Sequence, residues 1–519
     1  MNGAECLLQT LVANGVEVCF MNPGTSEMHF VSALDRVPGM RGILCLQEGV
    51  CSGAADGYGR MTGHPASALL HLGPGLGNAL SNFHNARKAR TPIVAIVGEH
   101  STPHLKLEAP LTSDIAAFAR TVSGYVRTVE SADSIGPAAR DAIAAALRLP
   151  GQIATLIVPA DFSWEESRSP VPTLVRPVRR PPAAEAIVRA VRTLRAPGTV
   201  GFVLGGSAIA NARSLEAAGR IAAATGARFL VDRSAPRLAS GRRPFLIRKV
   251  PYFPEPASAA LAGLTHLILV EADKPVSFFG YPNTPGSPVP ENCAVSTLAA
   301  RDEDGTAALE LLAAEFPAGR PGAPGEIAPP AGPPPTGGTL TLEAMGRSLA
   351  ALLPENAIVS DEMVSSGEPV LAQLCAAAPH DQLTIPGGSI GQGMPVGLGA
   401  AIACPDRKVV VLEGDGSAMY SFQALWTMAR ENLDVVVVIF ANRRYRILDV
   451  EMQRTGAKGV GIRANDMLDL GRPDLDFVSL ARGLGVPATR AGSAGEFTAQ
   501  LRDALAASGP RVIEASLPA

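Results

Sequence analysis

Two side chains that could bind a metal ion, Asp415 and Asn442, each follow an apolar run in the sequence. The runs at 409–412 and 435–440 predict two buried strands, and residues 417–429 predict a helix between them. In such a βαβ unit the carboxyl ends of both strands and the amino end of the helix meet at one crevice. We therefore expect Asp415 and Asn442 to face each other, and their oxygens are ligands that Mg²⁺ accepts.

The Gly-Asp-Gly turn at 414–416 also suits an anion. Gly414 and Gly416 allow a ligand to approach the backbone closely, Ser417 can cap the helix, and the free N–H groups of a helix start favour a diphosphate. The triplet alone is most often an ordinary turn. A second strand that ends in Asn after one crossover makes the metal and phosphate interpretation much more specific.

The sequence GDGS followed by Asn442 resembles the motif of enzymes that depend on thiamin diphosphate (ThDP). This family usually carries two asparagines, and Ala441 stands in place of the first. The resemblance implies that Asp415, Asn442 and the carbonyl of Arg444 hold Mg²⁺ on the diphosphate of the cofactor. The metal-binding Asn is intact despite the change at position 441.

Two more segments, VSDEMVSSGE at 359–368 and GGSIGQGMPVGLGAAIA at 387–403, resemble cofactor-binding segments of the same family. The resemblance implies that Ser365 contacts the diphosphate and that the Gly388 carbonyl binds the 4′-amino group of the pyrimidine. Ile390 would be the apolar wedge that keeps the two rings bent, and plain core packing is its alternative. The set implied to bind the cofactor is Gly24, Asn78, Ser365, Gly388, Ile390, Gly416 and Ser417.

An acid in the first part of the chain, Glu48, follows an apolar run at 43–46 and precedes a segment of small residues. An isolated Glu at such a junction is more often a cap or a solvated side chain than a catalyst. The segment ILCLQEGVCSGAADGYGRMTG nevertheless resembles the strand, acid and helix of ThDP enzymes, and the loops NPGTSE at 22–27 and HLGPGLGN at 71–78 resemble its neighbours. The resemblance implies that Glu48 protonates the pyrimidine N1′ and so activates the cofactor.

The overall pattern most resembles benzoylformate decarboxylase and related 2-oxo acid decarboxylases. Thr25 stands at the position of their loop serine, and His71 matches their first active-site histidine, so Glu48, His71 and Thr25 are the implied catalytic residues. A satisfied loop histidine is the alternative for His71. The second histidine of the benzoylformate enzymes has no counterpart in 271–283, which puts protonation after CO₂ loss in question.

The implied substrate pocket contains residues from both ends of the chain. Glu451 lies close in sequence to several arginines, which favours a polar substrate over an aromatic one. The alternative is that this Arg-rich segment is a solvated or interface surface. The pocket positions that the resemblance implies are Leu111, Thr384, Ile447, Leu448 and Glu451.

The implied function is decarboxylation of a 2-oxo acid with ThDP and Mg²⁺, with possible carboligation to an acceptor carbonyl. An acetolactate synthase-like carboligase is the alternative, because GGSIGQGMP is shared with that branch. The turn GGSAIANA at 205–212 resembles only a degenerate nucleotide loop, so FAD is not expected, and the short carboxyl-terminal end also disfavours the synthases. A protein that binds ThDP without catalysis is disfavoured because Glu48 and the metal ligands are present.

The predicted fold class is α/β, with three doubly wound parallel-sheet domains. Residues 1–165 would bind the pyrimidine, 183–317 would form a Rossmann-like middle domain, and 339–519 would bind the diphosphate and Mg²⁺. The Pro-rich stretches at 167–182 and 317–338 are the expected linkers. In this family the first domain of one subunit faces the third domain of another, which implies a homodimer or homotetramer with active sites at subunit interfaces.

Composition agrees with a buried globular enzyme. The 519 residues are 47% hydrophobic and 18% charged, with a net charge of −3, which gives no basic surface for nucleic acid. The seven cysteines are scattered without metal or disulfide spacing, as is typical of a cytoplasmic protein. No apolar run reaches the roughly 20 residues that span a bilayer, and the amino terminus reads as an amphipathic helix, not a signal peptide.

Overall fold

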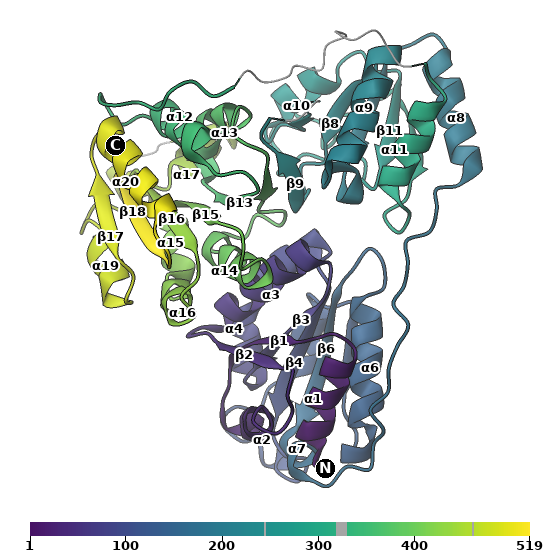
Figure 1. Ribbon diagram of the computed structural model, residues 1–519, viewed down its shortest axis with the longest axis vertical. Coiled ribbons are helices and arrows are strands. Elements are labelled where there is room, and N and C mark those ends of the chain that lie inside the picture. Colours follow the sequence, from purple (N-terminus) through teal and green to yellow (C-terminus); the bar gives the residue numbers. More distant parts are fainter. Residues whose placement is uncertain (243–244, 246, 318–329, 459–460, 519) are drawn as a thin grey trace.

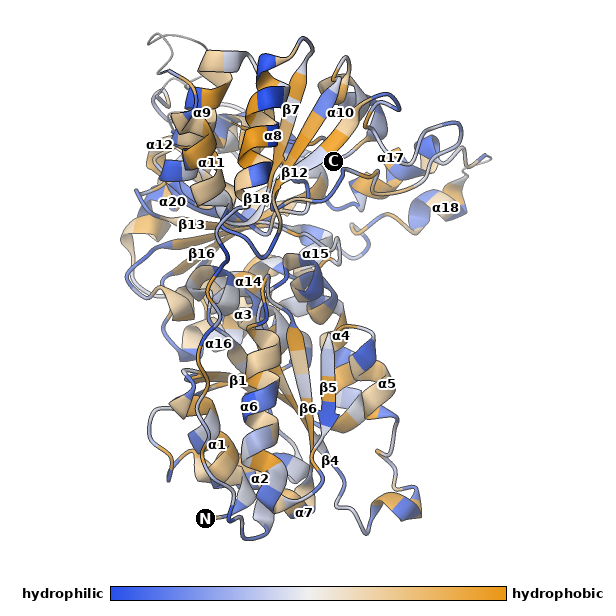
Figure 2. Cartoon of the chain, turned by 90° about the vertical axis from the view of Figure 1, so that its right-hand side faces the viewer, coloured by the Kyte–Doolittle hydropathy of each residue, from blue (hydrophilic) through white to orange (hydrophobic). Residues whose placement is uncertain are grey.

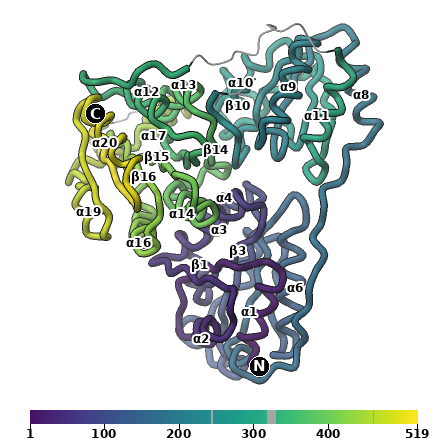
Figure 3. The backbone as a smooth tube through the Cα atoms, in the orientation of Figure 1, coloured from purple at the N-terminus to yellow at the C-terminus, as the bar shows by residue number. Residues whose placement is uncertain are grey.

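The computed structural model describes residues 1–242, 245, 247–317, 330–458 and 461–518. It confirms the predicted α/β class, because three separate sheets, each mostly parallel, are packed between helices (Figure 1). The predicted linker at 317–338 lies largely outside the described residues. The other linker, at 167–182, runs as a long extended strap between the first and middle sheets in the tube view (Figure 3).

The first sheet is entirely parallel and has the strand order β2-β1-β3-β4-β6-β5. Its two central strands are completely buried runs of apolar residues, as the sequence predicts for a sheet covered on both faces. The strands are β1 (Val18–Asn22), β2 (Arg41–Leu44), β3 (Ala66–Leu70), β4 (Ile93–Glu99), β5 (Tyr125–Thr128) and β6 (Ile153–Pro159). The helices are α1 (Gly3–Ala13), α2 (Met28–Ala33), α3 (Glu48–Thr62), α4 (Leu72–Ala89), α5 (Ile115–Arg120), α6 (Ile135–Ala146) and α7 (Ala160–Trp164).

The middle sheet is also parallel, in the order β10-β8-β7-β11-β12. Its core strands are orange in the hydropathy view, whereas α8 alternates between orange and blue because one face is exposed (Figure 2). The strands are β7 (Val200–Leu204), β8 (Arg228–Val231), β10 (Arg248–Lys249), β11 (His266–Val270) and β12 (Ala294–Ala299). The helices are α8 (Ala184–Arg195), α9 (Ala212–Thr225), α10 (Pro254–Leu261) and α11 (Gly305–Ala314).

The third sheet has the order β17-β18-β16-β15-β13-β14-β9. All of its pairs are parallel except the last, in which β9 runs antiparallel to β14. The strands are β9 (Arg237–Ser240), β13 (Ile358–Glu362), β14 (His380–Leu383), β15 (Val409–Gly414), β16 (Val435–Ala441), β17 (Ala488–Ala491) and β18 (Arg511–Ser516). The helices are α12 (Leu342–Leu352), α13 (Gly367–Leu374), α14 (Gly393–Ala403), α15 (Asp415–Ser421), α16 (Ala424–Arg430), α17 (Arg446–Arg454), α18 (Ile462–Asp466), α19 (Phe477–Gly483) and α20 (Ala494–Ala506).

The structure differs from the sequence prediction in three ways. Strand β9 comes from the stretch assigned to the middle part but completes the third sheet. The single helix predicted after the Gly-Asp-Gly turn is two helices, α15 and α16, separated at Phe422 and Gln423. Ser417 does not cap α15, because the N-cap residue is Gly414 and Ser417 lies inside the helix.

Helices α3 and α14 pack the first sheet unit against the third at the centre of the molecule (Figure 1). The two helices touch backbone to backbone. A Cβ on Gly57 would lie 2.1 Å from the Val396 carbonyl oxygen, and one on Gly399 would lie 1.9 Å from that of Ala54. Glycine is required at both positions, since any larger residue would push the helices apart. A single apolar core therefore runs through both units.

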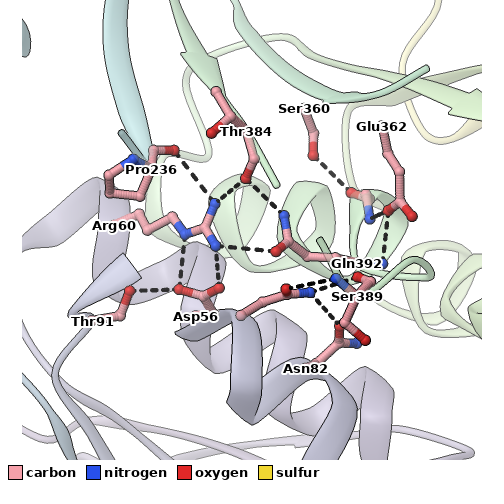
Figure 4. A network of polar contacts seen from close by, with 12 residues as sticks. Asp56, Arg60, Asn82, Thr91, Pro236, Ser360, Glu362, Thr384, Ser389 and Gln392 are labelled. Carbon is pink, nitrogen blue, oxygen red and sulfur yellow. Dashed lines mark hydrogen bonds and ion pairs between the residues drawn. The ribbon is translucent and has the colours of Figure 1, made fainter. Parts of the chain in front are cut away.

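A buried polar clamp reinforces this contact (Figure 4). The Arg60 guanidinium on α3 is ion-paired with Asp56 one turn earlier, and both side chains are almost fully buried. Arg60 also donates to the carbonyl of Thr384 at 2.7 Å and to Gln392 at 3.3 Å. Because these acceptors belong to the third unit, Arg60 fixes the relative position of the segment that leads into α14.

No helix in the described part of the chain is long and apolar enough to cross a membrane. All seven cysteines are free thiols, and five of them are buried.

Candidate active site

Glu48 is the first residue of α3, and three residues separate it from the end of β2 at Leu44. Its side chain is buried, with 8% of the residue exposed. The Asn22 amide donates to one carboxylate oxygen at 3.0 Å and the Asn78 amide donates to the other at 2.9 Å. Because no cation pairs with Glu48 among the described residues, its carboxylate is held in place by neutral donors and can accept a proton from a ligand.

His71 precedes α4 at the carboxyl end of β3 and is paired with Glu27. The His71 Nδ1 atom lies 2.8 Å from a carboxylate oxygen of Glu27, which also accepts the Gly24 backbone N–H at 2.7 Å. Gly24 must be glycine here, since an added Cβ would lie 2.3 Å from His71 Nδ1. The pair fixes the histidine ring against the NPGTSE loop.

Glu27 is a site residue that the sequence prediction missed. Burial raises the pKa of its carboxyl group, while the adjacent His71 and the Gly24 N–H oppose that shift. Its other oxygen is enclosed by Gly98 and has no hydrogen-bond partner among the described residues. The only signal in the sequence was its place in the same loop as Thr25.

The Glu48 carboxylate and the His71 side chain are close to each other. A Cβ on Gly75 would lie 3.5 Å from both the Glu48 carboxylate and the His71 Cβ, so Gly75 lies between them. Leu72, which follows His71, has a φ of +50°, a conformation that non-glycine residues adopt at a cost and that is enriched at functional sites. Glu48, Asn78 and His71 thus form one cluster at the carboxyl ends of β2 and β3.

Two other predicted residues of this part are exposed. Thr25 is the first residue of a short 3-10 helix beside this cluster, and no side-chain hydrogen bond holds it among the described residues. Leu111 is 38% exposed and lies in the loop before α5. The structure brings Thr25 to the cluster through its neighbours Gly24 and Glu27, but it shows no contact between Leu111 and Glu48.

Asp415 and Asn442 meet at the carboxyl ends of the adjacent strands β15 and β16. The Asp415 carboxylate accepts the backbone N–H of Arg443 at 2.5 Å and that of Gly416 at 2.9 Å. The Asn442 side-chain oxygen accepts the N–H of Arg444 at 2.9 Å. Arg443 has a φ of +58°, so the chain turns tightly at this point and keeps both side chains beside the same backbone.

This oxygen set fits a divalent cation. Asp415 is 4% exposed, burial raises the pKa of its carboxyl group, and no cation pairs with it in the described part of the chain. The described residues contain no group of three or more His, Cys, Asp or Glu side chains that could hold a metal. One carboxylate, one amide and the Arg444 carbonyl would hold Mg²⁺ in this turn, and anionic ligand oxygens would complete the shell.

The remaining predicted cofactor-binding residues lie around the same strand ends. Ser365 is in a short 3-10 helix (η5, Val364–Ser366) directly after β13. Gly416 lies under the ring of Tyr445, and a Cβ there would be 2.3 Å from that ring. Gly388 has a φ of +74° and is exposed, and Ile390 is half-buried two residues later. These residues therefore border the Asp415 turn and the segment before α14.

Two buried carboxyl groups lie beneath that segment. Glu362 and Glu413 are directly opposite each other on β13 and β15, and they are 1% and 0% exposed. Glu362 accepts the backbone N–H groups of Gly391 at 2.5 Å and Gln392 at 2.7 Å, and also bonds the Gly393 N–H. Burial raises the pKa of Glu362 to about 7, and burial together with the Glu362 charge raises that of Glu413 well above its usual range.

Ser417 is turned toward Glu362. The residue is 5% exposed, and its hydroxyl is among the groups that oppose the rise in the Glu362 pKa. The Ser417 side chain therefore supports the carboxylate below the loop. Its backbone N–H lies in the first turn of α15, and the start of a helix favours an anion.

The predicted pocket residues divide between two places. Thr384 is 4% exposed and its hydroxyl donates to the Ala235 carbonyl at 2.6 Å, so it belongs to the buried clamp of Figure 4. Ile447, Leu448 and Glu451 lie together on α17, next to η5. The Tyr281 hydroxyl of the middle unit donates to Glu451 at 2.9 Å.

The glycine pair that resembled a nucleotide loop is packed against an acid. Cβ atoms on Gly205 and Gly206 would lie 2.5 Å and 2.0 Å from atoms of Glu271. The Glu271 carboxylate accepts the Gly305 N–H at 2.9 Å and is ion-paired with Arg179. A phosphate at this turn would meet a buried like charge, which is consistent with a packing role for the glycines.

The Glu48 cluster and the Asp415 turn are not joined within the chain. In the described ranges, no hydrogen bond or ion pair links Glu48 or His71 to Asp415 or Asn442. The acid and the metal ligands stand on two different sheets, each at carboxyl strand ends. A ligand that uses both groups would have to span two surfaces.

Sequence comparisons match both the first and the third part of the chain to domains of one enzyme family. The family described as thiamine pyrophosphate enzyme, N-terminal TPP binding domain, matches residues 1–118, and the C-terminal TPP binding domain of the same enzymes matches residues 367–515. A Mycobacterium tuberculosis protein named "Putative acetolactate synthase large subunit IlvX" is 49% identical, over 100% of this chain and 99% of its own length. The benzoylformate decarboxylase of Pseudomonas aeruginosa is 28% identical, over 98% of this chain and 97% of its own.

Solved structures agree with the sequence comparisons. The ThDP-dependent 4-hydroxybenzoylformate decarboxylase of Rhodococcus jostii superposes with a TM-score of 0.87 at 25% identity, covering 100% of this chain and 99% of that one. The benzoylformate decarboxylase of Polynucleobacter necessarius superposes with a TM-score of 0.85 at 21% identity, covering 100% of this chain and 99% of that one, and supports the fold.

Proposed function

The chain belongs to the family of thiamine pyrophosphate enzymes, of the acetolactate synthase and benzoylformate decarboxylase type, and from this premise we propose that it uses ThDP and Mg²⁺ to decarboxylate a 2-oxo acid. The observation that carries the proposal is Glu48, a buried carboxylate held by two amides and by no cation among the described residues. Such a group can share a proton with a ring nitrogen of a bound cofactor.

The cofactor supplies an electron sink for cleavage of the bond to the carboxylate group. With the cofactor bound, Glu48 would exchange a proton with the pyrimidine N1′, and its two amide partners keep both oxygens oriented. Asp415, Asn442 and the Arg444 carbonyl would hold Mg²⁺ beside the diphosphate, and the Gly388 carbonyl would accept from the amino group of the pyrimidine. Ser365, Gly416 and Ser417 line the diphosphate, and Ile390 supports the rings.

His71 and Thr25 line the reacting carbonyl in this proposal. Glu27 orients the His71 ring through Nδ1, which leaves Nε2 to donate or accept a proton at the substrate. Leu448 and Ile447 give α17 an apolar face toward the substrate, with Leu448 44% exposed. Leu111 would join this pocket only from a neighbouring subunit or after its loop moves.

A carboligase is the second candidate, and one observation favours it. The relative at 49% identity is named as an acetolactate synthase subunit, although that name is itself provisional. In the segment that carries the second histidine of the benzoylformate enzymes, the side chains are Phe278, Phe279 and Tyr281. Tyr281 is hydrogen-bonded to Glu451, so no imidazole supplies a proton from this side, and capture by an acceptor carbonyl competes with protonation.

An oligomer completes the site in this proposal. Because Glu48 belongs to the first sheet unit and Asp415 to the third, the first part of one subunit and the third part of its neighbour would enclose one cofactor. This supports a homodimer or homotetramer, for which light scattering is the measurement. The seven free thiols support a reducing compartment, the cytoplasm.

The test is CO₂ release from aliphatic, aromatic and dicarboxylic 2-oxo acids, with ThDP and Mg²⁺ added and all products identified. An aldehyde product supports the decarboxylase, and a hydroxyketone product supports the carboligase. If no acid in the panel is turned over while ThDP is bound, the proposed reaction is wrong.

A further inference from the structure

Two cations, Arg233 and Lys249, have no hydrogen-bonded partner among the residues that the structure describes, and they lie at the seam between the middle and third sheets. Lys249 ends the short strand β10 and is in register with Val231 at the end of β8, and Arg233 follows two residues later. Both cations therefore stand at the carboxyl edge of the middle sheet, where parallel sheets bind ligands. The chain then enters β9, which is hydrogen-bonded into the third sheet, so this edge is held against the third unit.

The Arg233 guanidinium lies against two neighbouring aromatic rings, whose centres are 5.3 Å apart. Its central carbon lies 4.2 Å from the centre of the Tyr252 ring and 5.1 Å from that of Phe278. Its Nε atom is buried, and among the described residues no hydrogen bond or ion pair satisfies the group. The neighbouring Arg454 differs, because it is ion-paired with Glu255. A guanidinium that is desolvated and stacked in this way, with its donors unused, is suited to bind a carboxylate.

Lys249 adds a second positive charge. Burial lowers the pKa of its ammonium group, Arg233 lowers it further, and only Asp361 opposes the shift. Asp361 on β13 already accepts the Gln382 side chain at 2.8 Å and the Met363 N–H at 3.3 Å. The site thus has two cations and one carboxylate that is shared with other donors, which leaves a positive charge to be neutralised.

The aromatic rings connect this pair to the cofactor-binding segment. A Cβ on Gly388 would lie 2.4 Å from the tip of the Phe278 ring, so that ring rests on the segment before α14. Phe278 and its neighbour Phe279 are 37% and 52% exposed, which keeps this side of the seam open. Burial and the nearby charge of Glu451, a predicted pocket residue on α17, raise the pKa of Tyr252. Arg233 therefore borders the proposed active site from the middle unit.

We propose that Arg233 and Lys249 form an anion-binding subsite that receives the second carboxylate of a dicarboxylic 2-oxo acid, with the neighbouring rings of Tyr252 and Phe278 beside the chain between the two acid groups. This inference rests on the proposed function, since it names the substrate class of the same site. The carboxylate would occupy the donors that Arg233 leaves unused, and it would balance the charge of Lys249.

The test compares matched acids and matched variants of the protein loaded with ThDP and Mg²⁺. The reacting pair is 2-oxoglutarate and 2-oxopentanoate, which differ only in the distal carboxylate. Arg233→Met keeps an unbranched side chain against the rings, Arg233→Lys keeps the charge, and Lys274→Met removes an exposed cation of the adjacent loop as the control. We expect Arg233→Met to raise KM for 2-oxoglutarate about 10- to 100-fold with little change for 2-oxopentanoate, and Arg233→Lys to recover part of the loss.

Binding of unreactive acids separates this inference from the proposed reaction. Calorimetry should detect glutarate but not pentanoate, and Arg233→Met or Lys249→Met should abolish glutarate binding even if no 2-oxo acid is turned over. If Arg233→Met and Lys249→Met lose glutarate binding while Lys274→Met retains it, the result supports the subsite. Equal effects of Arg233→Met on both 2-oxo acids, or glutarate binding that Arg233→Met leaves unchanged, would overturn it. Binding of inorganic phosphate in preference to glutarate would also contradict a carboxylate subsite.

Discussion

The pair of buried carboxyl groups beneath the cofactor-binding segment leads to a quantitative prediction for Glu413→Gln. Glu362 receives three backbone N–H groups, which stabilise its ionised form, whereas both oxygens of Glu413 lack a hydrogen-bond partner among the described residues. The two side chains are opposite each other on adjacent strands, so two charges there would repel. We infer that Glu413 carries the proton in the folded protein.

The sign and size of the effect follow from proton linkage. The pKa of Glu362 is raised to about 7 and that of Glu413 well above its usual range, so the folded protein holds at least one proton that the unfolded chain has released. Stability is then greatest below the ordinary pKa of Glu and is lost as pH rises. The loss is about 1.4 kcal/mol per pH unit for one proton, or roughly 2.7 kcal/mol between about pH 5 and pH 7. Glu413→Gln keeps the shape of the side chain, removes its titrating carboxyl group and lets Glu362 ionise. Most of the change in the free energy of unfolding with pH should therefore disappear.

The assay is urea unfolding at several pH values, monitored by tryptophan fluorescence. A Trp164→Phe background leaves Trp426 as the one tryptophan, so the signal follows unfolding of the third unit. Glu355→Gln, an exposed position, is the matched control and should keep the slope of the parent protein. Infrared spectroscopy at pH 6 should also show the carbonyl stretch of a protonated carboxylic acid, and Glu413→Gln should remove it. Identical slopes in parent and Glu413→Gln, with no such band, would refute the shared proton.

Variants of the Arg60–Asp56 pair, of Asp415 and of the His71–Glu27 pair test three other parts of the structure. Arg60→Met leaves Asp56 buried without its cation and should destabilise the protein by about 3–5 kcal/mol, whereas an Asp56→Leu/Arg60→Met pair should recover most of the loss in the urea midpoint. Asp415→Ala should abolish the rise in melting temperature that ThDP and Mg²⁺ together produce, with no change in the melting temperature of the protein alone beyond a few degrees. His71→Ala should lower kcat by about 100-fold or more, and Glu27→Gln should lower it less while shifting the pH profile, because Glu27 only orients the ring. An unshifted profile would remove Glu27 from this role.

Much of the fold was predictable because the central strands are continuous apolar runs. Strands β4, β15 and β16 are buried along almost their whole length, and each was visible in the sequence. Strands β5, β12 and β17 lie at sheet edges and carry exposed polar residues, so they produce no such run. The break between α15 and α16 has no proline or glycine to signal it.

The part of the candidate site around Asp415 was predictable because its residue types and their spacing indicate one kind of chemistry. The Gly-Asp-Gly turn and Asn442 fall beside each other because adjacent parallel strands end at the same edge. Contacts between distant segments left no local pattern. The pairing of β9 with β14, the partnership of Glu27 with His71 and the contact of Arg233 with Tyr252 all join residues that are far apart in the sequence.

The central claim, that Glu48 activates a bound ThDP, is tested most directly by the exchange of the cofactor's C2 proton with solvent. The experiment compares the parent protein, Glu48→Gln and Glu99→Gln, since Glu99 is an equally buried glutamate of the same sheet unit, at 8% exposure for each. With ThDP binding verified in all three, we predict that Glu48→Gln slows the exchange by about 100-fold or more and that Glu99→Gln does not. Exchange in Glu48→Gln at the rate of the parent protein would contradict the account.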